Sequence, residues 1–214
     1  MSIAVKICGL GDAAGIDAAI TGGARFVGFV FYPPSPRAVT PDRAASLLAP
    51  VPPDVTKVGL FVDADDSAIA AALAAPLDLL QLHGGETPER VAAIKHRFGL
   101  PVMKAISIAA PGDVAAARAY DGVADWLLFD AKPPRDLAGA LPGGNGLAFD
   151  WRWLRAQAWT MPWMLSGGLT ADNLGEAVAI THALHVDVSS GVESRSGHKD
   201  PAMIGTFLRA AAAL

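Results

Sequence analysis

The chain has 214 residues, of which 52% are hydrophobic and 18% charged, and its net charge is only -4. This length suits a single α/β barrel domain, 1–214, with a large core. The weak charge, without a block of Lys or Arg, argues against nucleic acid and anionic membrane surfaces as partners. No apolar run reaches the roughly 18 residues of a membrane span, and we find neither a signal peptide nor enough cysteine for an internal disulfide. We therefore expect a cytoplasmic protein.

Eight short runs rich in β-branched residues predict strands, and each is followed by an Ala-rich helical stretch. The runs begin near Ala4, Phe26, Thr56, Asp78, Pro101, Asp125, Trp163 and His185. Among the expected helices are 12–23, 41–49, 88–98 and 171–184, several of which open with Pro, Thr or Asp. Strand followed by helix, repeated in this way, predicts parallel pairing and a single (β/α)8 TIM barrel. The alternative is an open doubly wound sheet, whose glycine fingerprint "CGLGDAAG" does not match.

Two of the loops that follow strands are unusually long, namely 32–41 ("YPPSPRAVTP") and 131–151 ("AKPPRDLAGALPGGNGLAFDW"). Barrel enzymes keep their chemistry in loops at this rim. We expect the second loop to act as a mobile lid, with a disordered crossing loop as the alternative.

Glycine-bearing turns follow the seventh and eighth predicted strands, in "LSGGLTADN" and "DVSSGVES". Free backbone N–H groups at such turns bind phosphate without a cationic side chain, and these two loops are the usual phosphate pair of barrels. Thr170 or Asp172 is the expected N-cap of the helix after the first turn. The predicted phosphate-binding residues are Gly167, Gly168, Ser189, Ser190 and Gly191. An ordinary tight turn is the alternative for the Gly167–Gly168 pair.

Alternation along the strands predicts which side chains point into the barrel mouth. Cys8 ends the first strand on the inward side, and Asp130 holds the equivalent position on the sixth strand. Gln81 and His83 point inward from the fourth strand, and Arg37 in the long second loop can reach over them. We take these last three as candidate substrate-binding residues.

Each candidate also has a purely structural interpretation. The thiol can be a small core side chain, and the carboxylate can pair with Lys132 or Arg135. The imidazole can hydrogen-bond a turn, and the guanidinium can lie in solvent. We expect no metal site, because His83 has no inward cluster of His or Asp beside it.

Seven segments together resemble the phosphoribosylanthranilate isomerase family of tryptophan biosynthesis. These segments are "VKICGL", "GFVFYPPSPRAV", "LQLHGGE", "LLFDAK", "GGNG" with "FDW", "LSGGLT", and "VDVSSGVES" with the following Gly197, Lys199 and Asp200, in order along nearly the whole chain. The resemblance implies a barrel without metal or cofactor that acts on a small phosphoribosyl substrate by an Amadori rearrangement. It also implies that Cys8 is the general base and Asp130 the general acid. The lid departs from the family pattern, with Asn145 in place of an expected threonine and with the added "AGALP".

The rearrangement needs one acid to open the sugar ring and one base to remove the proton at C2. An ordinary cysteine has a pKa of about 8.5, so we expect a nearby cation or helix N-terminus to lower the pKa of Cys8. Two alternatives to the isomerase remain. One is another phosphosugar barrel enzyme, such as an indoleglycerol phosphate synthase or a pentose phosphate epimerase. The other is a phosphate-binding barrel without catalysis. Monomer and homodimer are both open.

Barrel closure gives one prediction that is independent of the family. The eighth strand must pair with the first, which brings the inward side chains of Lys6 and Asp187 together one layer below Cys8. Neither charge is stable alone in that interior, so we predict an ion pair across the seam. In the alternative, the lysine reaches the bottom face of the barrel and the aspartate bonds only to backbone.

Overall fold

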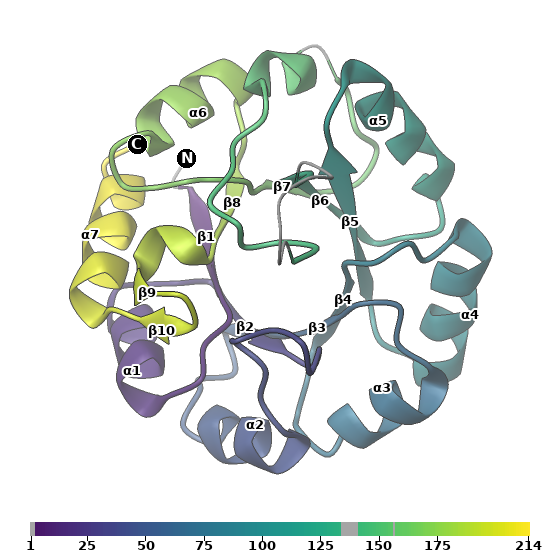
Figure 1. Cartoon of the computed structure of the whole chain (residues 1–214), viewed down its shortest axis with the longest axis vertical. Helices are drawn as coiled ribbons and strands as arrows, with labels where there is room; N and C mark the ends of the chain where they lie inside the picture. Colours follow the sequence, from purple (N-terminus) through teal and green to yellow (C-terminus); the bar gives the residue numbers. More distant parts are fainter. Residues whose placement is uncertain (1–2, 134–140, 156) are drawn as a thin grey trace.

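The structure is a computed structural model that describes residues 3–133, 141–155 and 157–214. Eight parallel strands close in chain order into a barrel, and helices surround it (Figure 1). The strands are β1 Ala4–Cys8, β2 Phe26–Val30, β3 Thr56–Phe61, β4 Leu79–Leu82, β5 Val102–Ile108, β6 Trp126–Ala131, β7 Trp163–Leu165 and β8 His185–Val188. The predicted (β/α)8 barrel is confirmed, and its closure excludes the open sheet.

The outer ring is built mainly from α-helices that begin at capped positions. Their bounds are α1 Ala13–Thr21, α2 Pro41–Leu48, α3 Asp66–Ala72, α4 Pro88–Phe98, α5 Pro111–Ala116, α6 Leu174–Thr181 and α7 Pro201–Ala212. Thr40, Thr87 and Asp200 each accept a backbone N–H at a helix start, directly before a proline at the first helical position. Gly99 ends α4 with φ 66°, a left-handed conformation that favours glycine.

The sequence prediction needs three corrections in the second half of the barrel. Between β6 and β7 the described residues form only a 3-10 helix, η2 Trp151–Leu154, where we expected a full helix. The helix α6 begins after Asn173 instead of at 171, because Asn173 Oδ1 accepts from the Thr170 N–H at 2.8 Å and closes a turn first. Neither Thr170 nor Asp172 is therefore its N-cap.

The third correction concerns the segment between β8 and α7, which we had read as one glycine turn. It contains a 3-10 helix, η3 Ser190–Val192, and a hairpin of β9 Glu193–Arg195 and β10 His198–Lys199. Gly197 turns the hairpin with φ 80°. The hairpin lies at the rim of the barrel beside β1 and α1 (Figure 1).

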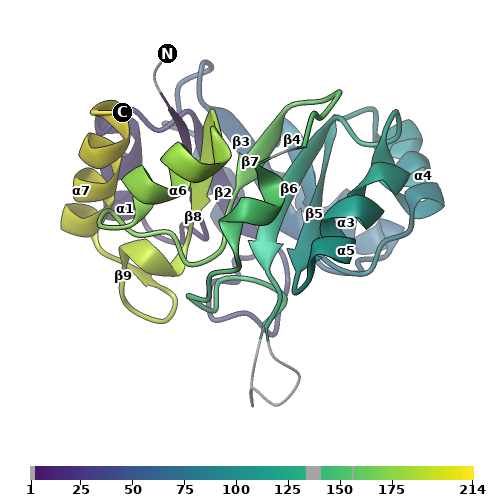
Figure 2. The same cartoon turned by 90° about the horizontal axis from the view of Figure 1, so that it is seen from above.

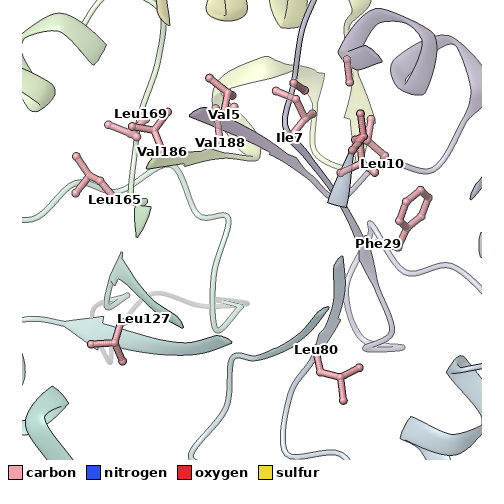
Figure 3. Packing of buried hydrophobic residues seen from close by; sticks show 14 of the residues in the cluster. Val5, Ile7, Leu10, Phe29, Leu80, Leu127, Leu165, Leu169, Val186 and Val188 are labelled. Carbon is pink, nitrogen blue, oxygen red and sulfur yellow. The ribbon is translucent and has the colours of Figure 1, made fainter. Parts of the chain in front are cut away.

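The core has two layers because neighbouring side chains of a strand face opposite ways. Outward residues such as Val5, Ile7 and Leu127 pack between the strands and the helices (Figure 3). Inward residues such as Phe26, Met103 and Leu128 fill the lower part of the barrel. The interior is therefore a packed core, and only the upper end of the barrel is left for a site.

The described part of the segment after β6, from residue 141 on, crosses the ring of strands in Figure 1 and lies beyond their C-terminal ends in Figure 2. Part of the expected lid, 134–140, is outside the described residues, and so is Arg135. Within the described part of the chain, no helix is both long and apolar enough to cross a membrane.

Candidate active site

The C-terminal ends of the strands surround a pocket of about 710 Å³, a volume that includes its opening to solvent. Segment 141–147 forms one wall of this pocket. The pocket is also lined by nine of the predicted site residues, namely Cys8, Arg37, His83, Asp130, Gly167, Gly168, Ser189, Ser190 and Gly191. Gln81 is fully buried and does not line it.

Cys8 ends β1 with only 4% of its surface exposed, above the inward side chain of Lys6. A Cβ atom placed on Gly28 of β2 would lie 3.1 Å from both Cys8 Sγ and Lys6 Nζ, so glycine gives these two groups room. Ser189 Oγ donates to the Cys8 carbonyl at 3.1 Å and ties the strand end to the loop after β8. The thiol is thus held at the edge of the pocket by its neighbours.

The pKa of the Cys8 thiol is raised above its ordinary value, mainly because burial disfavours the thiolate. The positive charge of Lys6 opposes this effect, and the negative charge of Asp187 adds to it. Our expectation of a lowered pKa is therefore wrong for the free protein. The cation that we expected is present, but desolvation outweighs it.

Lys6 and Asp187 form the predicted ion pair, with 2.8 Å between Nζ and Oδ1. Lys6 is fully buried, which excludes the alternative in which it reaches the bottom face. Burial alone would lower the pKa of Lys6, but the charges of Asp187 and Cys8 raise it above its ordinary value. The second carboxylate oxygen of Asp187 accepts from Ser166 Oγ at 3.0 Å, a partner that the sequence analysis missed.

Asp130 and His83 meet on the other side of the pocket, where Asp130 Oδ2 lies 3.2 Å from His83 Nε2. This approach is too poorly aligned for a hydrogen bond, and His83 Nε2 has no other partner within the described residues. Asp130 Oδ1 accepts from the Ala131 N–H at 2.9 Å, and His83 Nδ1 lies 3.0 Å from Gln81 Nε2. The polar neighbour of Asp130 is thus an imidazole and not Lys132, and Arg135 is outside the described residues.

Arg37 reaches the rim as predicted, but its guanidinium is not free. Nε and Nη2 donate to Glu193 at 2.7 and 2.9 Å, and Nη2 also donates to the Gly144 carbonyl at 3.0 Å. Nη1 has no hydrogen-bond partner in the part of the chain that the structure describes, and Arg37 is one of the residues that line the pocket. One edge of the guanidinium is therefore left for a ligand.

Glu193 and Lys199 were missed as site residues, although both lie in the last segment of the family pattern. Lys199 Nζ donates to Glu193 Oε1 at 2.6 Å and to the Ser189 carbonyl at 2.9 Å. Burial would raise the pKa of Glu193, but its bonds to Arg37 and Lys199 lower it. Burial lowers the pKa of Lys199 despite the attraction of Glu193. The available signal was the pair of charges flanking the glycine turn at Gly197.

The two predicted phosphate turns lie side by side and line the same pocket. Gly167 and Gly168 have φ of 90° and 63°, and a Cβ atom on Gly191 would collide with the Leu169 carbonyl oxygen. The N–H groups of Gly167 and Gly168 make no hydrogen bond within the described residues. Asn173 Nδ2 donates to the Gly168 carbonyl at 2.9 Å and fixes the first turn. These turns therefore present free backbone donors to an anion.

The described part of the lid touches both sides of the site. A Cβ atom on Gly143 would lie 2.7 Å from Asp130 Oδ2 and 2.8 Å from His83 Nε2. Asn145, which stands where we expected a threonine, closes a turn with Leu141. Its Oδ1 accepts from the Leu141 N–H at 3.1 Å, and its Nδ2 donates to the Leu141 carbonyl at 2.7 Å. Asn145 therefore shapes the turn of this segment.

No group of three or more His, Cys, Asp or Glu side chains within the described ranges is arranged to hold a metal ion. The polar groups of the pocket are instead a thiol, a carboxyl group with an imidazole, a guanidinium and backbone N–H donors. This donor set suits acid–base chemistry on an anionic substrate.

Barrels that gather such groups at the C-terminal ends of their strands are enzymes, and this chain is one of them. It belongs to the N-(5'-phosphoribosyl)anthranilate isomerase family, whose model matches residues 5–210. Two relatives carrying that name come from Paracoccus denitrificans and Rhodospirillum centenum. The first is 59% identical over 100% of this chain and 99% of its own length. The second is 57% identical over the full length of both.

Solved structures agree with this assignment. A phosphoribosylanthranilate isomerase from Thermotoga maritima is 33% identical, with a TM-score of 0.87 over 99% of this chain and 100% of its own. Another, 32% identical with a TM-score of 0.84 and the same coverage, was solved with reduced 1-(o-carboxyphenylamino)-1-deoxyribulose 5-phosphate. The resemblance that the sequence motifs indicated is confirmed.

Proposed function

We propose that this chain converts N-(5-phosphoribosyl)anthranilate into 1-(2-carboxyphenylamino)-1-deoxyribulose 5-phosphate, as an isomerase of tryptophan biosynthesis. The reaction is an Amadori rearrangement with Asp130 as general acid and Cys8 as general base. The observation that carries the proposal is that a thiol and a carboxyl group, borne by β1 and β6, line one pocket together with two phosphate-type turns.

In the first step, Asp130 gives its proton to the ring oxygen of the sugar. The bond between C1 and that oxygen breaks with its electron pair on oxygen, and the nitrogen lone pair forms the iminium at C1. Gly143 packs over Asp130 and His83, which supports proton transfer in a site sheltered from water.

In the second step, the Cys8 thiolate takes the proton from C2. The electrons of that C–H bond form the C1–C2 double bond, and the iminium electrons return to nitrogen. The enolamine then gains a proton at C1 and loses the hydroxyl proton at O2, which gives the ketose. Because burial raises the pKa of Cys8, the thiolate is a minor form at neutral pH, and the positive iminium beside C2 must favour the transfer.

The remaining pocket residues hold the two ends of the substrate. The free N–H groups of the turns at 167–168 and 189–191 bind the phosphate. Nη1 of Arg37 lies at the rim and donates to the anthranilate carboxylate, while the other two guanidinium nitrogens stay on Glu193. Gln81 is proposed to act on the substrate only through His83, because it does not line the pocket.

The test is to mix purified protein with freshly made phosphoribosylanthranilate and follow the loss of its fluorescence. The proposal expects rapid loss and a product that matches the deoxyribulose phosphate by mass spectrometry and NMR. Loss no faster than without protein would contradict the proposal. Tight phosphate binding without turnover would favour the non-catalytic barrel.

A further inference from the structure

The fourth strand carries a buried polar chain that leads to Asp130 and is not explained by substrate contact. Gln81 is 0% exposed and His83 is 6% exposed, yet each has one polar atom without a partner in the described part of the chain. These atoms are Gln81 Oε1 and His83 Nε2. A buried group without a hydrogen bond destabilises the fold, so its retention at the mouth of a site needs a functional reason.

The contact between Gln81 and His83 fixes which imidazole nitrogen carries hydrogen. The amide nitrogen of Gln81 is only a donor, so His83 Nδ1, 3.0 Å away, must be the acceptor. The neutral ring then carries its hydrogen on Nε2, the atom that lies 3.2 Å from Asp130 Oδ2. If the Gln81 amide were turned over, its nitrogen would be the buried atom without a partner. Two N–H donors would then be unpaired in place of one carbonyl oxygen, so the present orientation is favoured.

The Nε2–H donor lies 3.2 Å from an oxygen that becomes negative during the reaction. When Asp130 gives up its proton, the bonding electrons stay on the carboxylate, and a nearby N–H stabilises that charge. The present contact is poorly aligned, so the bond is gained only as the charge on Oδ2 develops. Donors of this kind accelerate a reaction because they bind the transition state better than the ground state.

We infer that Gln81 and His83 are positioning residues for the general acid. Gln81 selects the Nε2–H tautomer of His83, and His83 stabilises the carboxylate that Asp130 leaves behind when it protonates the sugar ring. This inference rests on the proposed function for its kinetic part, while the tautomer can be tested without any substrate.

The first experiment is nitrogen NMR of the imidazole rings in protein labelled with ¹⁵N. The chain has five histidines, and the spectrum of His83→Gln identifies the His83 signals by their loss. At neutral pH we expect His83 to be neutral with hydrogen on Nε2. In Gln81→Glu the new carboxylate can only accept, so we expect the hydrogen to move to Nδ1. A wild-type ring protonated on Nδ1, or on both nitrogens, would overturn the inference.

The second experiment separates positioning from binding. His83→Leu should lower kcat by about tenfold or more, the lower range for loss of one preorganised donor, while KM and the Kd of the reduced product stay within about twofold. His83→Gln presents an amide N–H near the position of Nε2 and should recover much of the rate. Equal rates for the two variants, or a raised KM with unchanged kcat, would count against a positioning role.

Gln81 offers a matched pair of substitutions. Gln81→Met removes the donor at similar size and leaves the tautomer free, whereas Gln81→Glu imposes the wrong tautomer. We expect kcat to fall further in Gln81→Glu than in Gln81→Met, and wild-type rates in both would overturn the inference. If either variant fails to fold, the wild-type NMR result still decides. A wild-type protein that is inactive on phosphoribosylanthranilate would instead refute the proposed function, whatever the tautomer.

Discussion

Lys6 Nζ lies 2.8 Å from Asp187 Oδ1, across the seam where β8 closes on β1. The two residues are register partners on neighbouring strands, and both are buried. Since the lysine also lies directly below the thiol of Cys8, the ion pair links closure of the barrel to the electrostatics of the site.

The first prediction concerns that seam. Lys6→Met should lower the free energy of unfolding by roughly 3 to 5 kcal/mol, because it leaves a buried carboxylate without its cation. The double variant with Asp187→Leu should regain much of this loss. Urea unfolding of the two single variants and the double variant gives the coupling. A double variant no more stable than Lys6→Met would contradict the account.

The second prediction concerns the ionisation of the thiol. Burial raises the pKa of Cys8, so in the free protein the thiolate should form only at a higher pH than that of an ordinary cysteine. The measurement is thiolate absorbance near 240 nm as a function of pH. Subtracting the absorbance of Cys8→Ser from that of the wild type removes the contribution of the tyrosines. If the thiolate is the base, kcat/KM should rise with pH until the thiol has titrated. A titration midpoint below the ordinary value would refute the prediction.

The third prediction concerns the base itself. Cys8→Ser should reduce turnover by at least about 10²-fold, since a serine hydroxyl does not ionise in this range, while the Kd of the reduced product changes little. Stopped-flow fluorescence and equilibrium titration measure the two quantities. Near-normal turnover by the variant would remove Cys8 from the mechanism.

The fourth prediction concerns Arg37. Arg37 lines the pocket, and Glu193 accepts from its Nε and Nη2 but not from Nη1, so Arg37→Ala should weaken binding of the anthranilate compound by about tenfold or more. Binding of free ribose 5-phosphate should change much less. Calorimetry on both ligands makes the comparison, with Glu193→Gln as the control for loss of the ion pair alone. Equal weakening of both ligands would show that the guanidinium does not recognise the aromatic end.

Local patterns in the sequence predicted the barrel and the Lys6–Asp187 pair well. Alternation along a strand has a period of two, and closure of eight strands in chain order leaves β8 only β1 as its second partner, besides β7. The inward placement of Cys8 and Asp130 follows from the same rule.

Features that depend on contacts between distant loops could not be predicted. Arg37 and Glu193 are 156 positions apart, and their bond depends on a hairpin that no strand pattern indicated. Gln81 was correctly predicted to point inward. Only the folded structure shows that it lies below the pocket, which His83 lines in its place. The raised pKa of Cys8 depends on a balance between burial and the charge of Lys6. The degree of burial is known only from the folded structure, so the sequence could not predict which effect is larger.

The central claim is that Asp130 supplies the proton that opens the ring, and one comparison tests it most directly. Two quantities are measured for Asp130→Asn: the initial rate at which it consumes phosphoribosylanthranilate, and the Kd with which it binds the reduced product. An amide has nearly the same shape but cannot deliver that proton, so we predict that turnover collapses while the Kd stays close to that of the wild type. Turnover close to the wild-type rate, or loss of binding together with turnover, would contradict the account.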